Sequence, residues 1–121
     1  MFKNLRFVYI TTSGREEARR IGQILVEDKF AACVNILDGM ESIYRWDDKV
    51  ITDQECVLIA KTEQRHLARL TRRVKELHSY DCPCIVTLTV TEQEGNKEYL
   101  QWLIDQTANP EPELNSEPRS S

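Results

Sequence analysis

The segment His78-Ser79-Tyr80-Asp81-Cys82-Pro83-Cys84-Ile85 places an imidazole, a phenol, a carboxyl and two thiols within seven residues. Imidazole and thiolate are ligand types that suit copper and zinc. Pro83 stiffens the backbone between the thiols and keeps it out of a helix. The segment is therefore expected to end a helix and enter a strand, and it offers His78, Cys82 and Cys84 as candidate ligands for copper or another divalent cation.

Two interpretations of this segment remain open from the residues alone. A closed metal site needs about four ligands, and the chain lacks the two spaced Cys pairs of a structural zinc site, so a second subunit would have to complete it. In the alternative interpretation, His78 bonds the last carbonyls of a helix and the thiols are partly buried. Alternate residues of an extended segment point to opposite sides, so no disulfide is expected between Cys82 and Cys84.

Composition narrows the class of protein. The formal net charge of −4 argues against broad binding to nucleic acid or to an anionic membrane. The longest apolar runs are too short to span a bilayer, and the N-terminus lacks the apolar region of a signal peptide. Cys33 and Cys56 lie within apolar strand patterns. We expect a cytoplasmic protein with reduced cysteines.

The first half of the chain predicts a strand, a helix and a long hairpin. Residues 5–12 are almost continuously apolar, and Ser13 with Glu16 matches a capping box for a helix to about Asp28. Residues 31–62 have the pattern of one bent β-hairpin. A bulge is expected at Gly39, and a polar turn at residues 47–49.

The second half predicts a helix, a strand and a further helix. Thr62 is expected to cap the second helix, whose apolar stripe has helical spacing: Leu67, Leu70, Val74, Leu77. Residues 85–91 alternate between apolar side chains and threonine, as in a strand with one covered face. Asn96 is expected to cap a third helix. Residues 109–121 are rich in Pro, Glu, Asn and Ser, which predicts a disordered tail after one domain over residues 1–108.

The order β-α-β-β-α-β with an extra C-terminal helix predicts an α+β ferredoxin-like sandwich. Its two main helices cover one face of the sheet, and the other face still carries apolar residues. The hairpin arms are longer than such a sandwich needs, since strands usually run about 5–6 residues. These features predict self-association through strand edges.

The chain carries no motif of an enzyme. It has no phosphate-binding glycine loop, no nucleophile elbow and no HExxH pair, so we expect no catalytic activity. Five aromatic residues are candidates either for the walls of a small-molecule cleft or for packing: Tyr44, Trp46, Tyr80, Tyr99, Trp102.

Several motifs together resemble the CutA family over nearly the whole chain, to about Thr107. They are Ala31-Ala32-Cys33-Val34-Asn35-Ile36, Ser42-Ile43-Tyr44-Arg45-Trp46, Lys61-Thr62, His78-x-Tyr80-x-x-Pro83-x-Ile85 and Asn96-x-x-Tyr99-x-x-Trp102-Leu103. The resemblance implies a homotrimer and a role in divalent-cation tolerance, with copper binding in some members and no established reaction. It also implies kinship to the trimeric PII signalling proteins, and hence an alternative role in binding a small effector between subunits. The implied inter-subunit cleft contains Tyr44, Trp46, Lys61, Tyr80, Cys84 and Trp102.

The chain departs from the family pattern at several positions. Ser79 stands where the family usually has Pro, Cys84 where it has Glu, and Asp48 where it has Gly. Ile10 or Thr11 stands where some members carry a copper-binding Cys. Only His78 therefore matches a metal-associated position of the family, and the true ligand stays open.

Overall fold

The computed structural model describes residues 2–91 and 93–108 of the 121-residue chain. Its elements are β1 (Leu5–Thr12), α1 (Arg15–Glu27), β2 (Cys33–Trp46), β3 (Lys49–Glu63), the 3-10 turn η1 (Gln64–His66), α2 (Leu67–Leu77), β4 (Ile85–Thr89) and α3 (Lys97–Gln106). The predicted order β-α-β-β-α-β-α is confirmed. Strand β4 ends two residues earlier than predicted. The predicted tail, residues 109–121, lies outside the described residues, and the domain boundary at 108 stays a prediction.

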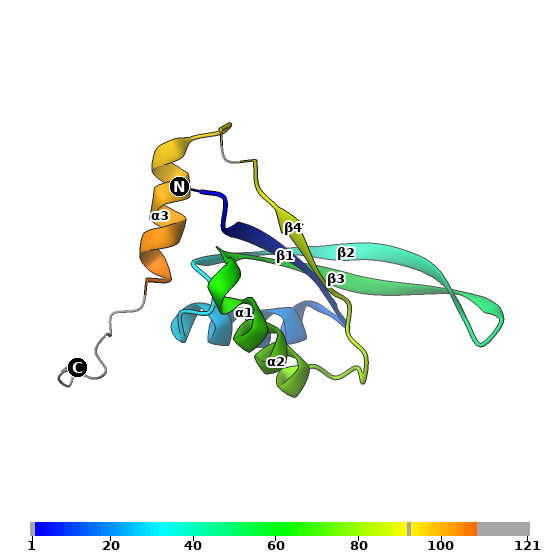
Figure 1. Cartoon of the computed structure of the whole chain (residues 1–121). Coiled ribbons are helices and arrows are strands. Elements are labelled where there is room, and N and C mark those ends of the chain that lie inside the picture. The colour runs from blue at the N-terminus through cyan, green and yellow to red at the C-terminus, as the bar shows by residue number, and fades with distance from the viewer. Residues whose placement is uncertain (1, 92, 109–121) are drawn as a thin grey trace.

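The four strands form one antiparallel sheet in the order β2-β3-β1-β4. Helices α1 and α2 lie side by side on one face, as Figure 1 shows, which confirms the ferredoxin-like sandwich. The core between them is apolar and fully buried, with Val8 and Ile10 from β1 and Leu58 from β3 against Ile21, Leu25, Leu70 and Val74 from the helices. Burial of this apolar stripe holds the two layers together.

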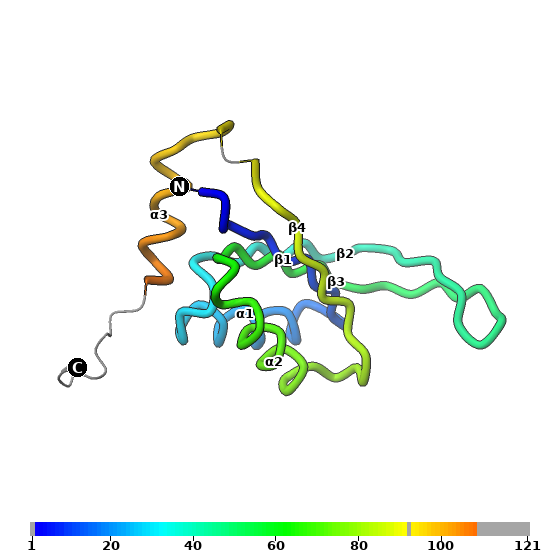
Figure 2. The backbone as a smooth tube through the Cα atoms, viewed as in Figure 1, coloured from blue at the N-terminus to red at the C-terminus, as the bar shows by residue number. Residues whose placement is uncertain are grey.

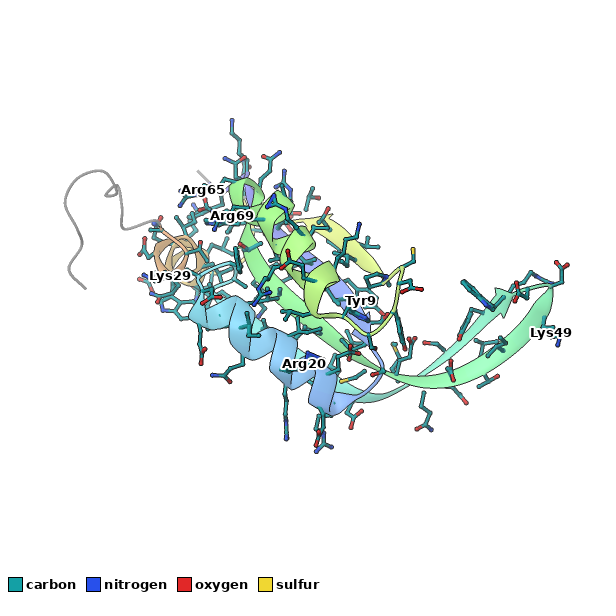
Figure 3. The ribbon with its side chains drawn as sticks, turned by 90° about the horizontal axis from the view of Figure 1, so that it is seen from below. Tyr9, Arg20, Lys29, Lys49, Arg65 and Arg69 are labelled. Atoms are coloured by element: carbon teal, nitrogen blue, oxygen red, sulfur yellow. The ribbon has the colours of Figure 1, made fainter. Side chains whose placement is uncertain are left out.

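The β2–β3 hairpin extends as an arm well beyond the rest of the sheet (Figure 2). Figure 3 places Lys49 at its far end, away from Arg65 and Arg69. The strands are joined by Asp47 and Asp48, both with positive φ (52° and 62°). Two such residues give the turn type that matches the twist of a hairpin, and Asp tolerates this conformation better than most side chains.

A bulge at Gly39 reverses the faces of β2. Leu37 pairs with Val57 and Met40 with Glu55, so two residues of β2 oppose one residue of β3. Gly39 has φ +84°, which glycine adopts without steric cost. Before the bulge, odd-numbered residues of β2 lie on the face away from α1 and α2; after it, even-numbered residues do. The predicted bulge is confirmed, and it turns Tyr44 and Trp46 to that face.

The face of the sheet opposite α1 and α2, here called the open face, is covered at one end only. Helix α3 packs there on Phe2, Leu5 and Ala32 through Leu100 and Leu103. Beyond α3, three large apolar side chains are about half exposed or more: Leu37 (57%), Val86 (50%) and Leu88 (52%). In the single chain both faces of β4 are exposed, because Thr87 and Thr89 on one face are exposed as well as Val86 and Leu88 on the other.

Two of the three predicted helix caps are wrong. Gly14, without a side-chain cap, precedes α1; Ser13 instead donates from its backbone N–H and hydroxyl to Glu17 Oε1 (2.9 and 2.8 Å). Thr62 donates its hydroxyl to the Phe30 carbonyl (2.6 Å) rather than capping the second helix. The cap of α3 is confirmed, because Asn96 Oδ1 accepts from the N–H groups of Glu98 and Tyr99.

Candidate functional site

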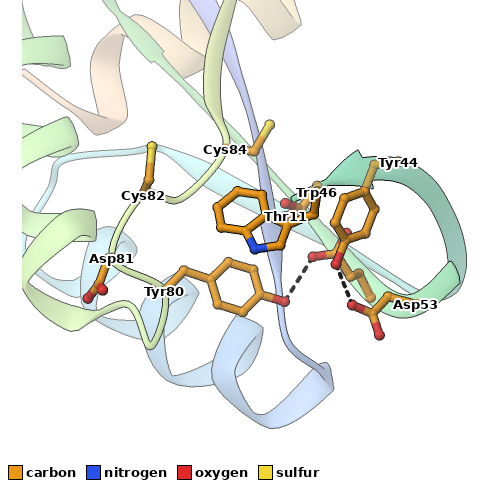
Figure 4. A pocket seen from close by; sticks show the side chains of 9 residues that line it. Thr11, Tyr44, Trp46, Asp53, Tyr80, Asp81, Cys82 and Cys84 are labelled. Atoms are coloured by element: carbon orange, nitrogen blue, oxygen red, sulfur yellow. Dashed lines mark hydrogen bonds between the residues drawn. The ribbon is translucent and has the colours of Figure 1, made fainter. Parts of the chain in front are cut away.

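A pocket of about 540 Å³ lies between the hairpin arm and the segment that connects α2 to β4. Figure 4 shows its lining, which comes from four parts of the chain: Thr11 at the end of β1, Tyr44 and Trp46 on β2, Asp53 and Glu55 on β3, and Tyr80, Asp81, Cys82 and Cys84 on the connecting segment. The pocket lies on the open face, so the bulge at Gly39 is what brings the β2 residues to it. The structure thus joins four predicted cleft residues, Tyr44, Trp46, Tyr80 and Cys84, in one site.

Hydrogen bonds from hydroxyl groups hold in place the two β3 carboxylates that line the pocket. The Tyr44 hydroxyl donates to Asp53 Oδ2 (2.6 Å), one diagonal step across the hairpin. Glu55 accepts through both oxygens, from Ser42 Oγ (2.8 Å) and from the Tyr80 hydroxyl (2.9 Å). The Tyr80 bond ties the connecting segment to the arm and closes one side of the pocket.

Both phenols are held in the protonated form. The hydrogen bond to Asp53 raises the pKa of Tyr44, and the nearby Glu55 charge acts in the same direction. Burial raises the pKa of Tyr80, and its bond to Glu55 raises the pKa further. At neutral pH the two rings are therefore neutral and donate their protons to carboxylates.

His78 is fixed by two hydrogen bonds within the chain. Its Nε2–H donates to the Thr11 carbonyl (2.8 Å), and its Nδ1 accepts from the Tyr80 N–H (3.0 Å). Its side chain is fully buried. Because both ring nitrogens are in use, His78 positions Tyr80 beside β1 in this arrangement and could ligate a metal only after one of these bonds is broken.

Glu17 anchors the other end of the connecting segment. Its side chain is only 6% exposed, and its Oε2 accepts the Ser79 N–H (2.6 Å) while Oε1 accepts both donors of Ser13. Burial by itself raises the pKa of Glu17, but the bonds from Ser13 and Ser79 outweigh it and lower the pKa to about 2. Glu17 is therefore ionised, and it holds the 78–84 segment against the start of α1.

Cys82 and Cys84 are both exposed, free thiols that line the pocket. They lie on the connecting segment ahead of β4, and both border the same pocket, as Figure 4 shows. Cys56 is buried and Cys33 partly buried, and both are free. The thiols and carboxylates include donors suited to a metal ion. Within residues 2–91 and 93–108, however, no three His, Cys, Asp or Glu side chains converge on one point, so this part of the chain does not fit a closed metal site by itself.

Two predicted cleft residues lie elsewhere. Lys61 Nζ hydrogen-bonds the Tyr99 hydroxyl (3.2 Å) and lies over the Phe7 ring, at the end of the open face covered by α3. Trp102 stacks on Tyr99, with ring centroids 5.7 Å apart. Neither residue lines the pocket.

Sequence reasoning missed the acidic residues of the pocket, and the hairpin pattern contained a signal for two of them. A two-residue turn at Asp47-Asp48 pairs Ser42 with Asp53 and Met40 with Glu55. Counting outwards from that turn places Asp53 and Glu55 on the face of Tyr44 and Trp46. Asp81 stands between the predicted residues Tyr80 and Cys82, whereas Thr11 had no comparable signal, because only tertiary packing brings β1 beside the connecting segment.

The fold and the pocket together define a ferredoxin-like α+β protein with an acidic, aromatic site beside a long hairpin arm. Residues 6–106 match the family model of the CutA1 divalent ion tolerance protein. The chain is 49% identical over 100 residues to the divalent-cation tolerance protein CutA of Thermus thermophilus, covering 83% of this chain and 95% of that protein. It is 43% identical to the chloroplastic protein CutA of Arabidopsis thaliana, over 84% of this chain and 55% of that one.

A solved structure gives the same result for the fold. The crystal structure of CutA1 from Oryza sativa superposes with a TM-score of 0.84 at 39% identity, covering 90% of this chain and 99% of that one. The chain belongs to the CutA1 divalent ion tolerance family.

Proposed function

We propose that this protein acts in divalent-cation tolerance as a homotrimer that binds copper or a related divalent cation directly. The observation that carries the proposal is the pocket, which gathers two free thiols and carboxylates at one edge of an uncovered sheet face. Family membership supports the role in cation tolerance. No catalytic step is assigned to the site, and we propose that the protein is not an enzyme.

The proposed trimer rests on the open face and the arm. Half-exposed apolar side chains lie on the open face, and on the opposite face of the arm Ile43 and Val50 are both more than 60% exposed. An apolar surface of this kind is stabilised when another copy covers it. We expect light scattering to report about three chains per particle, and Leu37→Lys to shift the population to smaller species. A stable wild-type monomer would contradict the proposal.

The proposed cation site uses the thiols and needs a second subunit to complete its ligand set. Anaerobic calorimetry with copper on the reduced protein, in buffer free of added reductant, should give saturable heat with the wild type and none with the Cys82→Ser, Cys84→Ser double variant. The matched control is Cys33→Ser, which removes a thiol remote from the pocket. The same measurement on the His78→Ala variant tests the remaining predicted ligand. Absence of heat above background with the wild type would remove the metal role from this protein.

A second candidate function is supported by the walls of the same pocket. Tyr44, Trp46 and Tyr80 form an aromatic surface around a few polar groups, in a volume typical of small-molecule sites. The protein would then be a PII-like module whose pocket binds a small effector between subunits.

Location in the cytoplasm is part of the proposal. The part of the chain that the structure describes has no helix long and apolar enough to cross a bilayer. The Arabidopsis relative is named as chloroplastic, so location varies in the family.

A further inference from the structure

We propose that the pocket binds a small organic cation carrying an ammonium or methylated ammonium group. The aromatic rings of Tyr44, Trp46 and Tyr80 would surround the cation, and Asp53 would supply the opposing charge. The inference rests on the second candidate function and names the class of its ligand.

The charge of the pocket selects a cation. Its lining includes three carboxyl side chains, Asp53, Glu55 and Asp81, and no Lys, Arg or His. Opposite charges attract strongly where a pocket wall limits the access of water. Phosphate and carboxylate ligands would meet only repulsion from these residues.

The two pocket carboxylates of β3 have different roles: Glu55 builds the pocket wall and Asp53 faces a ligand. Glu55 uses both oxygens, for Ser42 and for Tyr80, and so holds the wall together. Asp53 uses Oδ2 for the Tyr44 hydroxyl, whereas Oδ1 has no hydrogen-bond partner among residues 2–91 and 93–108. Asp53 can therefore contact an ammonium group without giving up its bond to Tyr44.

The aromatic rings favour an organic cation over a bare metal ion. Tyr44 is 38% and Trp46 62% exposed, so ring surface is open to a ligand. The faces of neutral aromatic rings attract cations, with Trp the strongest, and methylated ammonium groups fit such surroundings because they also bury apolar area. The bonds to Asp53 and Glu55 keep both phenols neutral, which preserves this property of the rings. A volume of about 540 Å³ holds a small molecule rather than a single ion.

Three probes of similar shape and different charge test the proposal: tetramethylammonium, the neutral tert-butanol and the anionic pivalate. Binding is read from Trp46 fluorescence in a Trp102→Phe background, which leaves one of the two tryptophans, and from calorimetry, both with a chelator present and ionic strength matched. We expect tetramethylammonium to bind at least about tenfold more tightly than either other probe.

Variants locate the binding. Asp53→Asn and Trp46→Leu should each weaken tetramethylammonium binding by about tenfold. Asp48→Asn is the matched control, since it removes one carboxylate at the exposed hairpin tip and should leave the affinity unchanged. Equal weakening by Asp48→Asn would show a general charge effect and overturn the proposed site.

The remaining outcomes distinguish failure of this inference from failure of the second candidate function, on which it rests. Binding of tert-butanol or pivalate as tight as that of tetramethylammonium would overturn the proposal that the ligand is an organic cation. The pocket would still be a site for a small effector. Absence of binding by all three probes would overturn both. The cation-tolerance role is judged separately, by the copper calorimetry.

Discussion

Replacing Glu17 by Gln should lower the free energy of unfolding by about 2–3 kcal/mol at neutral pH. The buried carboxylate accepts three hydrogen bonds, two from Ser13 and one from Ser79. An amide keeps the shape but removes the charge and turns one acceptor into a donor, which then faces the backbone N–H of either Ser13 or Ser79. Denaturant unfolding at one fixed protein concentration measures the change, because an oligomer gains stability with concentration.

The same residue predicts how stability depends on pH. The pKa of Glu17 is about 2 in the folded protein and about 4.5 without these contacts. The folded-state pKa is the lower one, so the contribution is complete above pH 4.5 and is lost as the pH falls towards 2. It amounts to about 3 kcal/mol. Glu17→Gln should flatten this part of the stability profile.

Glu16→Gln is the control for both measurements. Glu16 is the adjacent residue on the same helix and is exposed, so its replacement should change stability by less than about 0.5 kcal/mol. Equal losses from the two substitutions would show that the Ser13–Glu17–Ser79 contacts do not hold the connecting segment.

Replacing Gly39 by Val should lower the free energy of unfolding by about 1–2 kcal/mol. Gly39 has φ +84°, a conformation that β-branched residues rarely adopt. The strain is relieved only by giving up the bulge, and a regular ladder through residue 39 would move residues 40–46 to the opposite face, because side chains alternate along a strand. Tyr44 and Trp46 would then leave the open face, while Asp53 and Glu55 would stay. Denaturant unfolding at one fixed protein concentration measures the change.

A second readout reports directly on the face of Tyr44. In the wild type, the hydrogen bond to Asp53 raises the pKa of Tyr44. Loss of the bulge in the Val variant would break that bond, so Tyr44 should ionise at lower pH in an absorbance titration. Gly39→Asn is the control, since Asn accepts positive φ better than most residues and keeps the bulge. Equal stability and an equal Tyr44 titration in the wild type and the Val variant would show that the φ of residue 39 does not hold the bulge.

Local sequence patterns predicted most of the fold correctly, because they reflect forces that act within a few residues. The apolar run of β1, the stripe of α2 and the cap at Asn96 are all as expected. The two wrong caps have one cause in common. Ser13 donates to Glu17, which is held in place by Ser79 from the connecting segment. Thr62 donates to the carbonyl of Phe30. In both cases tertiary packing supplies the partner that replaces the local helix cap.

The segment 78–84 shows where prediction from sequence ends. Its residue types left a metal-binding cluster and a structural turn both open, and nothing local showed that the Thr11 carbonyl would accept from His78. No disulfide was expected between Cys82 and Cys84, and both are free thiols; that both border one pocket follows only from the packing of the segment beside the arm.

The sequence by itself determined the order of elements, the bulge at Gly39 and the family, since periodicity, glycine conformation and motif spacing are properties of the chain. Only the tertiary structure decided which side chains form the site. Asp53 reaches Tyr44 within the hairpin, but Glu55 reaches Tyr80, and the 78–84 segment reaches Thr11, only because α2 returns the chain to the edge of β1. These contacts join residues far apart in the chain, and their energies depend on geometry that no local pattern contains.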